Sequence, residues 1–436
     1  MFSRFLKYIL PPFTFRVFFR RIFYSNLKKV PLEKPLLFVG NHQNSFMDGI
    51  LVGSYLPQPI HFTMRADMFR KPFARFCLRE LNVSPVYRIE EGFENVHKNL
   101  EAFGSIYDIL IKNGNFIMFS EGICVQEKRL QKLRKGTARL AFGAEEKFGL
   151  DVNIVPVGIN YTYPARFRKE VMINFHDAFS IRELKDLFKT NPAKALLAFN
   201  EKCDEGLRKE VIIIEDPKND WLAEQLLKMG RNDMVLPFFK WRFDTDDRRL
   251  MEKGISEKIN HLSRSDPDKL NSLIQDVKSY SDLLIKNRLS DANIARKLDW
   301  GFLRYFTLIA GFPLFIAGYL SNLIPFLIPR LICDKLIKDP RFFSSVYISS
   351  GTLLYLIYFP LILILAAIFA GWPGVMLALL VPPAGYLVLF YQEIFRERLD
   401  TLRFTWLNAR KSDLIRELAG YRRNIIDLMG KITINP

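Results

Sequence analysis

Residues 35–49 read PLLFVGNHQNSFMDG, a short apolar run that ends in a polar turn. Amphipathic stretches then alternate with three more apolar runs: NFIMFS at 115–120, NIVPVGINYTY at 153–163 and VMINFH at 171–176. Short apolar runs separated by helical stretches are typical of an α/β domain, in which helices cover the faces of a central sheet. The sequence therefore predicts such a domain from Pro35 to about Phe179.

The composition favours a membrane over nucleic acid as the anionic partner of the chain. The 436 residues include 63 lysines and arginines against 46 aspartates and glutamates, which gives a net charge of +17. An excess of this size implies a polyanionic neighbour. The 39 phenylalanines cluster with arginine and lysine, a combination suited to the lipid headgroup boundary. We therefore expect membrane lipid as a partner and no nucleic acid.

The four cysteines give no sign of a disulfide framework or a zinc site. They lie far apart and show neither C-x-x-C nor Cys/His spacing: Cys77, Cys124, Cys203 and Cys333. We expect reduced thiols in a cytoplasmic setting and no bound metal.

The first 30 residues interleave phenylalanine with arginine and lysine on both sides of Pro11 and Pro12. This pattern indicates amphipathic helices at the membrane interface over residues 1–30, broken at the prolines. A helix packed on the protein's own core is the alternative. Because Lys7 and the prolines interrupt the apolar run, we do not expect a cleaved signal peptide.

Beyond residue 300 the chain becomes strongly apolar. Three blocks, at 302–329, 347–371 and 374–393, are each long enough to cross about 30 Å of hydrocarbon. The segments before, between and after them are basic, which places these flanks in the cytoplasm. The first block is then a re-entrant or helical hairpin broken near Gly311–Pro313, and the other two are a transmembrane pair that turns at Gly371–Gly374.

Helical segments flank this membrane-embedded region, residues 301–394. Residues 180–300 are charged and helical in period, so we expect a helical extension of the α/β domain at 181–300. Residues 395–436 place one apolar stripe at helical spacing, which predicts a cytoplasmic amphipathic helix, either on the surface or used for self-association. We interpret it as a surface helix. From the apolar blocks and their basic flanks we expect an integral membrane protein whose α/β domain lies on the cytoplasmic face.

The densest polar chemistry lies at Gly40–Gly49, directly after the apolar run LLFV. His42 stands at the predicted strand end, and Asp48 follows one to two helical turns later. A carboxylate beside an imidazole fixes its tautomer and stabilises the imidazolium that forms when the ring takes a proton. The strand-to-helix turn is also expected to point backbone N–H groups at a developing anion. A general base is one interpretation of His42, and a cap or core hydrogen bond is the other.

Three further segments end where an α/β protein builds its site. Val83–Arg88 ends a strand-like run on an arginine, Phe119–Gly122 ends another on an acid–glycine turn, and Ile154–Gly158 lies in the next strand. Between the last two lie basic residues able to meet a phosphate: Lys128, Arg129, Lys132, Arg134 and Lys135. The alternative is that these basic residues lie on a solvent-exposed helix face, and we expect this of most of them.

In these four ordered blocks the sequence resembles the glycerolipid acyltransferase family, which contains the glycerol-phosphate and lysophosphatidate acyltransferases. The resemblance covers about residues 30–180. It implies an acyltransferase core at 31–180, with a central mixed sheet flanked by helices. In that family the first block is N-H-x4-D, and its histidine is the general base. By similarity this role falls to His42, and the orienting role falls to Asp48.

The resemblance also implies residues that bind the acceptor. The arginine that ends the second block helps to bind the acceptor phosphate in the family, which implies this role for Arg88. The third block is usually F-P-E-G-T-R-S, and Phe119, Glu121 and Gly122 match it. Glu121 and Gly122 are therefore expected to hold the glycerol phosphate. The fourth block, an apolar strand with proline, matches Val155–Val157.

Two departures from the family pattern matter. His42 and Asp48 are separated by five residues instead of four, so the turn must carry an extra residue or the carboxylate must reach from a different angle. This spacing resembles the fungal-type glycerol-3-phosphate acyltransferase branch. The third block also lacks its usual arginine two residues after the glycine. Arg129 or a residue of Leu133–Gly136 is expected to replace it.

The resemblance implies a membrane-bound enzyme of phospholipid synthesis. It would move a fatty acyl group from acyl-CoA or acyl-carrier protein to 1-acylglycerol-3-phosphate, with glycerol-3-phosphate as the alternative acceptor and no cofactor. An inactive membrane scaffold or transport component is the rival, suggested by the longer His–Asp spacing and the apolar blocks. A transport path usually carries ionisable groups inside the membrane. Only Arg304 interrupts 302–328, and the apolar body of 347–393 carries none, which favours the enzyme.

Overall fold

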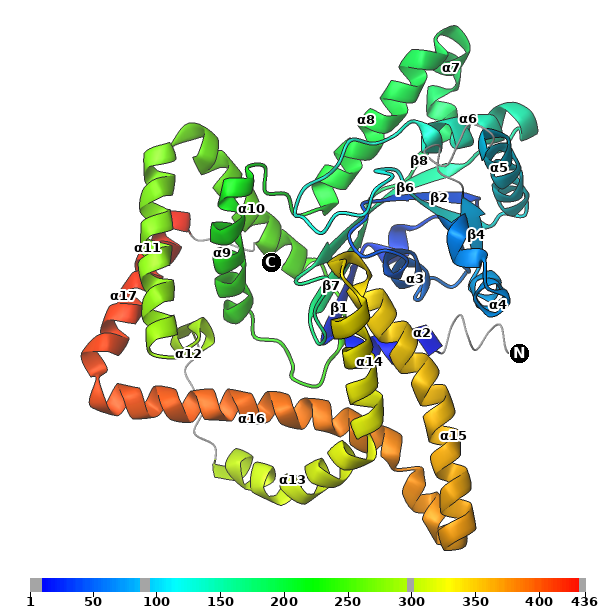
Figure 1. Cartoon of the computed structure of the whole chain (residues 1–436). Coiled ribbons are helices and arrows are strands. Elements are labelled where there is room, and N and C mark those ends of the chain that lie inside the picture. Colours follow the sequence, from blue (N-terminus) through cyan, green and yellow to red (C-terminus); the bar gives the residue numbers. More distant parts are fainter. Residues whose placement is uncertain (1–9, 87–94, 296–301, 431–436) are drawn as a thin grey trace. The chain divides into compact units, whose positions relative to one another are not determined.

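The structure is a computed structural model that describes residues 10–86, 95–295 and 302–430 (Figure 1). The chain divides into two compact units. The sheet unit comprises the residues up to Ile213 together with Phe239–Arg249 and Asp339–Ser345. The helical unit comprises Ile214–Phe238, Leu250–Lys338 and the residues from Val346 onward. Two late segments of the chain therefore belong to the sheet unit.

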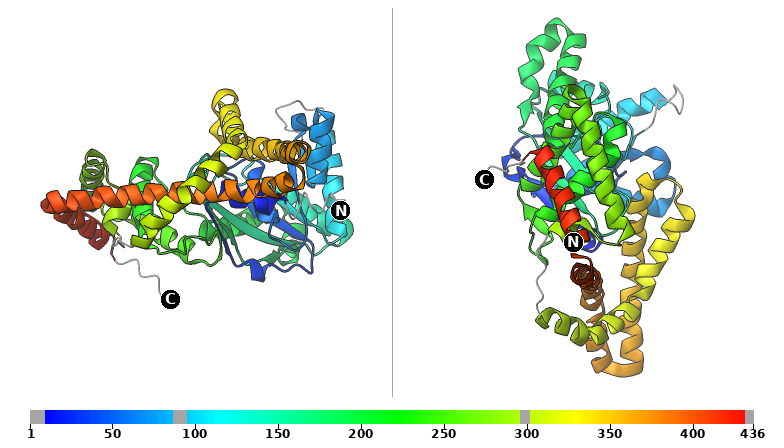
Figure 2. Two further views of the ribbon diagram at one scale, coloured as in Figure 1. Left: turned by 90° about the horizontal axis from the view of Figure 1, so that it is seen from below. Right: turned by 90° about the vertical axis from the view of Figure 1, so that its left-hand side faces the viewer.

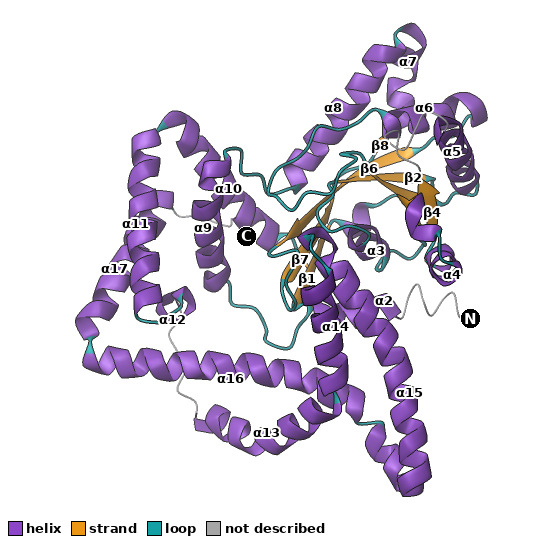
Figure 3. Cartoon of the chain, in the orientation of Figure 1, coloured by secondary structure: helices purple, strands orange, loops and turns teal. Residues whose placement is uncertain are grey.

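A mixed sheet forms the centre of the sheet unit (Figure 3). Its strand order is β4-β3-β5-β2-β6-β7-β1-β9, and the short β8 pairs with β6 off this path. β7 runs antiparallel to β6 and the other pairs on the path are parallel, so the predicted mixed sheet is confirmed. The strands are β1 (Arg21–Ser25), β2 (Leu36–Gly40), β3 (Ile60–Arg65), β4 (Val83–Val86), β5 (Asn115–Phe119), β6 (Asn153–Tyr161), β7 (Glu170–Phe175), β8 (Phe179–Ser180) and β9 (Arg242–Asp244).

Strand β2 lies between β5 and β6, and both of them run parallel to it. Gly40, the last residue of β2, is in register with Phe119 of β5 and Val157 of β6. Parallel strands place their carboxyl ends at one edge of a sheet. The chain segments that follow β2, β5 and β6 are therefore brought together at this edge.

Helices cover both faces of the sheet (Figure 3). On one face Leu37 and Phe116 share a buried core with α5, α6 and α8. On the other face α3 packs closely, since a Cβ added to Gly49 would lie 3.0 Å from the Phe62 ring. The helices of this unit are α2 (Leu10–Phe18), α3 (Met47–Gly53), α4 (Pro72–Glu80), α5 (Asn95–Ile111), α6 (Gly136–Phe148), α7 (Lys185–Thr190) and α8 (Pro192–Glu210), with 3-10 turns at Leu27–Lys29, Ala66–Phe69 and Ile181–Leu184.

The expectation of interfacial helices through residue 30 is wrong for residues 21–25. These residues form β1, which lies between β7 and β9, and Ile22–Tyr24 are buried. Helix α2 also buries Phe15, while Phe13 stays 56% exposed. The aromatic residues after Pro12 mainly serve the protein's own core, which was the alternative. Residues 1–9 lie outside the described part of the chain.

The expected boundary between core and extension at residue 180 is also wrong. Helix α8 packs on β6, because Gly206 of the helix lies against Pro156 of the strand. Strand β9, inside the expected extension, joins the edge of the sheet beside β1. A strand of three residues is too short to show a period of two, which explains why the sequence pattern does not reveal it.

The helical unit has its own core, built from α9 (Asp220–Asp233), α10 (Asp247–Ser265), α11 (Pro267–Lys286), α12 (Asp291–Ala295) and α17 (Ser412–Met429). Leu273 of α11 and Leu418 and Ile425 of α17 are buried in it. Arg422 of α17 donates to Asp291 at 2.9 Å. The interpretation of the tail as a surface helix is therefore wrong, because its apolar stripe packs inside the unit.

The helical unit also contains α13 (Phe302–Ser321), α14 (Leu323–Leu336), α15 (Phe343–Ala378) from Val346 onward, and α16 (Val381–Arg410). Helix α16 is one continuous rod in Figure 2 and packs on α13, where the Tyr391 hydroxyl donates to the Leu308 carbonyl at 2.8 Å. Helix α15 leaves helical geometry at Gly371, with φ 58° and ψ −151°, inside the segment where a turn was expected. The expected break near Pro313 is wrong, because α13 continues through this proline.

One helix in the described part of the chain, Pro340–Ala378, is long and apolar enough to cross a membrane, and its most apolar window is entirely unburied. Leu308–Ser321 and Leu323–Leu336 meet the same test together but are bent by 56° at the break between them. By length and composition the structure therefore offers one candidate span, or two if the bent pair counts as one.

Candidate active site

His42 and Asp48 lie side by side at the carboxyl edge of the sheet. His42 follows β2, and Asp48 lies in the first turn of α3. The His42 Nδ1 atom is 2.9 Å from Asp48 Oδ2. The His42 side chain is 19% exposed, whereas the Asp48 side chain is fully buried, at 0%. With Nδ1 facing the carboxylate, the other ring nitrogen, Nε2, is the atom able to take a proton from a substrate.

The backbone of Ser45 accommodates the extra residue between His42 and Asp48. Its φ of 47° lies in the left-handed region, which few non-glycine residues adopt. Asp48 Oδ2 also accepts hydrogen bonds from the backbone N–H groups of Gln43 and Asn44, each at 2.9 Å. The longer spacing therefore still brings the carboxylate to the imidazole.

Tyr161, the last residue of β6, completes the surroundings of Asp48. Its hydroxyl donates to Asp48 Oδ1 at 2.6 Å. Burial of the phenol, together with the negative charge of Asp48, raises the pKa of Tyr161 well above its usual value. The hydroxyl therefore keeps its proton for this bond. Both carboxylate oxygens of Asp48 are thereby held in place.

Glu121, in the turn that follows the neighbouring strand β5, accepts a hydrogen bond from the backbone of the same loop. Its Oε2 accepts a hydrogen bond from the His42 backbone N–H, and its Oε1 accepts one from Gln131, each at 2.9 Å. Burial raises the pKa of Glu121, and these two backbone N–H groups partly offset the effect. Both carboxylate oxygens thus meet backbone amides. The expected role of Glu121 in holding the glycerol phosphate stays a prediction.

The position of the imidazole is fixed by packing as well. The His42 ring stacks on Phe119 with a centroid distance of 4.3 Å and an interplanar angle of 14°. Gly40 leaves room for this stack, because a Cβ there would lie 3.1 Å from the Phe119 ring. Asn41 fastens the loop to β6, since its Oδ1 accepts from the Ile159 N–H at 2.7 Å and its Nδ2 donates to the Ile159 carbonyl at 2.9 Å.

The backbone N–H groups of residues 42–45 are already engaged inside the protein. Their partners are the carboxylates of Glu121 and Asp48 and, at 3.3 Å from the Ser45 nitrogen, the Cys124 Sγ atom. The expectation that this turn presents its amides to a developing anion is therefore wrong for these four residues. Two of them, the N–H groups of Gln43 and Asn44, fix Asp48 instead.

The residues expected to bind the acceptor phosphate have different placements. Arg88 lies outside the described residues. Gly122 has φ 71°, and a Cβ added there would lie 2.7 Å from Arg134 Nε. Arg129 forms an ion pair with Glu127 at 2.9 Å. Among the expected substitutes for the missing arginine, Arg129 and the residues of Leu133–Gly136, the side chain of Arg134 lies against the acid–glycine turn.

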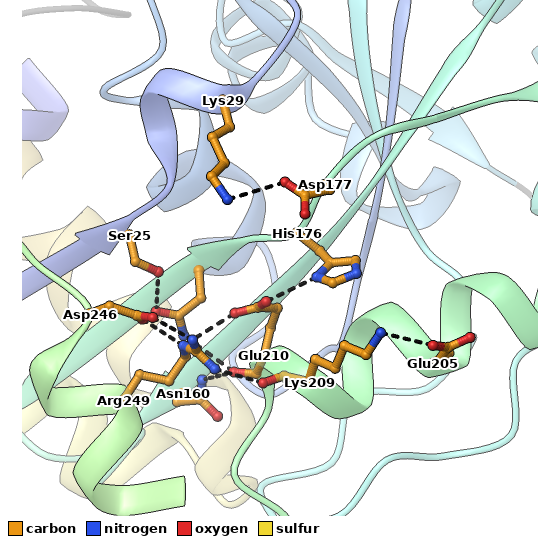
Figure 4. A network of polar contacts seen from close by, with 11 residues as sticks. Ser25, Lys29, Asn160, His176, Asp177, Glu205, Lys209, Glu210, Asp246 and Arg249 are labelled. Atoms are coloured by element: carbon orange, nitrogen blue, oxygen red, sulfur yellow. Dashed lines mark hydrogen bonds and ion pairs between the residues drawn. The ribbon is translucent and has the colours of Figure 1, made fainter. Parts of the chain in front are cut away.

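A second histidine–carboxylate pair lies in the sheet unit (Figure 4). His176 Nδ1 is 3.0 Å from Glu210 Oε1, and the His176 side chain is 22% exposed. Glu210 Oε2, however, also forms an ion pair with Arg249 at 3.2 Å, and the Glu210 carbonyl accepts from Asn160 at 2.9 Å. This network fixes the end of α8. Because Arg249 compensates the charge of the Glu210 carboxylate, the His176–Glu210 pair suits a structural role better than base catalysis.

Comparison with known proteins places the His42–Asp48 pair inside a segment that matches a known family. The model of the acyltransferase family matches residues 21–160, the segment that runs from the first residue of β1 almost to the end of β6 and contains the His42–Asp48 pair. Over this segment the chain is similar to the acyltransferase family.

Two individual proteins are also similar to this chain. The chain is 26% identical over 260 residues to glycerol-3-phosphate O-acyltransferase 1 of Saccharomyces cerevisiae, and the match covers 56% of this chain and 33% of that protein. The matched region thus spans about a third of the relative's length. The crystal structure of the 1-acyl-sn-glycerophosphate (LPA) acyltransferase PlsC from Thermotoga maritima is 18% identical, with a TM-score of 0.34, over 48% of this chain and 79% of that chain.

The sequence analysis assigns no role in the candidate site to Asn41, Cys124 or Tyr161. Tyr161 carries a usable signal, because it ends an apolar run whose strand lies beside the one before His42. Cys124 gives no signal, since its partner Ser45 lies in a loop whose path no local pattern specifies. Asn41 stands beside His42 in the first block, but nothing local points to its partner Ile159 on β6.

Within the ranges described, no group of three or more His, Cys, Asp or Glu residues is placed to hold a metal ion.

Proposed function

We propose that this protein is an acyltransferase that moves a fatty acyl group from acyl-CoA or acyl-carrier protein to a hydroxyl of a glycerol phosphate. The observation that carries the proposal is the His42–Asp48 pair, within the segment that matches the acyltransferase family. A partly exposed imidazole backed by a buried carboxylate suits the removal of a proton from a hydroxyl. The rival hypothesis of an inactive membrane scaffold was suggested mainly by the longer His42–Asp48 spacing. It is weakened, because the two side chains still form a pair at this spacing.

The reaction needs a single base and a thioester. His42 Nε2 takes the proton of the acceptor hydroxyl as its oxygen attacks the thioester carbonyl carbon. The tetrahedral intermediate collapses, the carbon–sulfur bond breaks, and the proton on His42 passes to the leaving thiolate. Asp48 stabilises the imidazolium between these steps. General base catalysis of this kind contributes roughly 10²–10⁴-fold to the rate.

Glycerol-3-phosphate is the acceptor that we favour. The matched yeast relative is named a glycerol-3-phosphate O-acyltransferase, and the five-residue spacing resembles the fungal-type branch. The sequence alone placed 1-acylglycerol-3-phosphate first, and it is now the second candidate. Both carry a phosphate monoester, so Arg88 and Arg134 are proposed to bind it.

We also propose that the enzyme works at the cytoplasmic face of a membrane. The candidate span Pro340–Ala378 gives it an anchor. Lys335 and Lys338 lie just before this span and are exposed, and basic flanks favour the cytoplasmic side. A fatty acyl donor and its lipid product both partition into such a membrane.

The test compares acyl transfer by purified wild-type, His42→Ala and His176→Ala protein in detergent, with acyl-CoA and each acceptor offered separately. His176 is the matched control, because it is similarly exposed and also pairs with a buried carboxylate. We expect His42→Ala to lose at least 100-fold in turnover, from the base contribution of roughly 10²–10⁴-fold, and His176→Ala to stay near wild type. Equal activity of wild type and His42→Ala would contradict the mechanism.

The same assay tests the phosphate contacts. Arg134→Ala and Arg88→Ala are expected to raise the KM for the acceptor about tenfold with kcat little changed, because each removes a charged contact to the phosphate. Arg129→Ala is the comparison, since Arg129 pairs with Glu127. An unchanged acceptor KM in Arg134→Ala would remove that residue from the proposal.

A further inference from the structure

Residues 339–345 form a late segment of the chain that belongs to the sheet unit. They comprise the 3-10 turn η7 (Pro340–Phe342) and the first residues of α15. Ser344 and Ser345 are fully buried, each at 0% exposure. The helix that begins here is also the one that is long and apolar enough to cross a membrane. The start of the candidate span is thus packed among the loops of the sheet unit.

The loop after β5 holds this segment through two hydrogen bonds. Arg341 Nη1 donates to the Cys124 carbonyl at 3.1 Å, and Gln126 Nε2 donates to the Pro340 carbonyl at 3.2 Å. Asp339 accepts from the Arg341 side chain at 2.6–2.9 Å, which orients the guanidinium. A charged donor with a fixed orientation makes a stronger hydrogen bond than a neutral one.

The two buried serines reach the other two loops at this edge. Ser345 Oγ lies 3.5 Å from the Asn44 carbonyl, in the loop that carries His42. Ser344 donates to the Pro164 carbonyl, in the loop after β6, and Asn44 Nδ2 donates to the same carbonyl at 3.1 Å. Loops after all three central strands are therefore tied to the first turn of α15.

Cys124 links Arg341 to the candidate base. The Ser45 N–H donates to the Cys124 Sγ atom at 3.3 Å, and the N–H of the next residue, Val125, donates to the His42 carbonyl at 2.9 Å. Holding the Cys124 carbonyl therefore also holds the backbone on both sides of the His42 turn.

We propose that residues 339–345 are a fixed wall of the active site and that Arg341 is a positioning residue for the His42 loop. The docked segment thereby ties the His42 loop to the helix that offers the candidate span, and the membrane is the proposed route of the acyl donor. The inference rests on the proposed acyltransferase function. A span attached through a flexible linker would not fix the site at the membrane in this way.

The first test uses full-length protein in lipid nanodiscs, with palmitoyl-CoA as donor and glycerol-3-phosphate as acceptor. Arg341→Ala is expected to lower kcat about tenfold with the donor KM within about twofold, and Arg341→Lys to recover most of the loss, because lysine can still donate to the Cys124 carbonyl. The matched control is Arg330→Ala, an exposed arginine that pairs with Asp334 on α14. Unchanged kcat in Arg341→Ala would overturn the positioning role.

The second test separates the position of the span from the chemistry. A Gly-Gly-Ser insertion between Ser345 and Val346 keeps the docked segment but frees the helix, and the same insertion after Lys411, at the break between α16 and α17, is the control. We expect the first insertion to lower turnover of palmitoyl-CoA at least fivefold and to leave that of water-soluble butyryl-CoA within about twofold. An equal loss with both donors, or none, would overturn the proposed route.

A third measurement does not depend on activity. Amide hydrogen exchange of peptides covering 42–47 and 122–127 should be faster in Arg341→Ala than in wild type or Arg330→Ala, because the loops lose a tie to α15. Wild-type protein that transfers no acyl group would refute the proposed function, while this exchange result would still decide the positioning role. Identical exchange in all three proteins would refute it.

Discussion

Asp48 receives more hydrogen bonds than a partner for His42 alone requires. Its two oxygens accept from the Tyr161 hydroxyl and from two backbone N–H groups besides facing the His42 ring. A carboxylate surrounded in this way cannot rotate without leaving buried donors unpaired, which is costly. The orientation of the imidazole is therefore set by the loop, the first turn of α3 and the end of β6 together.

The first prediction concerns Tyr161. Tyr161→Phe removes the hydroxyl that holds Asp48 Oδ1, so we expect kcat to fall about tenfold with little change in either KM, and the free energy of unfolding to fall by about 1–3 kcal/mol. Tyr24→Phe is the matched control, since it removes a buried tyrosine hydroxyl that donates instead to the Leu51 carbonyl at 2.9 Å. It should lose similar stability but keep kcat. Equal kcat in both variants would exclude a catalytic effect of the Tyr161 bond.

Cys124 gives a prediction about pH. Burial, and after it the charge of Asp48, raises the pKa of the Cys124 thiol to about 12. At pH 8 the reactive thiolate is then roughly a thousandfold scarcer than for an ordinary thiol of pKa about 8.5, so iodoacetamide should leave Cys124 unmodified in the native protein. Because the folded pKa is the higher one, this thiol stabilises the fold below about pH 9 and the contribution is lost as the pH rises towards 12.

Peptide mapping by mass spectrometry measures the modification of Cys124, and denatured protein is the control in which it should react as an ordinary thiol. Modification of the native protein at the denatured rate would show that the thiol is neither buried nor perturbed as the structure indicates.

Among the strands, β2, β5, β6 and β7 and the edge strand β4 could be predicted from the sequence, whereas β1, β3 and β9 could not. The runs that became β2, β5, β6 and β7 are predominantly apolar because both of their faces are covered. Strands β1 and β9 lie towards the edge, where β1 carries an arginine and a tyrosine that resemble an interfacial helix and β9 has three residues. Their pairing depends on contacts between distant segments, which no local period contains.

The residues of the candidate site likewise divide into those that the sequence indicated and those that only the structure reveals. His42 and Asp48 share one turn, so their spacing alone indicated a pair. Tyr161 and Arg341 come from segments far along the chain, and only the meeting of three loops at one sheet edge brings them to this turn. The left-handed backbone of Ser45 has no sequence signature either, since serine rarely adopts it.

Helix α17 allows a test at the level of an element. Leu418 is fully buried in the core of the helical unit. Leu418→Ala should therefore lower the free energy of unfolding by about 2–5 kcal/mol, from lost burial and the cavity that remains. Leu250→Ala, at a leucine that is 46% exposed on α10, is the control and should cost far less. A surface helix, as the sequence pattern suggested, would give similar small losses in both variants, measured by thermal or chemical unfolding.

On the scale of the whole molecule, neither unit is a continuous stretch of chain. The sheet unit takes β9 and residues 339–345 from the second half of the sequence. A truncation after residue 300 would therefore remove part of the candidate active site along with the apolar helices. Loss of activity in such a truncation would not by itself separate anchoring from catalysis, which is why substitutions within 339–345 are the sharper test.

The topology of α15 provides the last prediction. The helix from Phe343 to the break at Gly371 is about 40 Å long at 1.5 Å per residue, which exceeds the ~30 Å of a hydrocarbon core. Since the active-site loops hold its first turn and basic residues precede it, its start should be cytoplasmic and its break should reach the opposite side.

Single cysteines at Lys335 and Trp372 test this arrangement, because the first precedes the span and the second follows the break at 72% exposure. In intact cells a membrane-impermeant maleimide should label Trp372→Cys from outside, whereas Lys335→Cys should need permeabilisation. If both positions react only after permeabilisation, α15 does not cross the membrane. The docking of residues 339–345 would then hold the site beside a helix that lies in one leaflet.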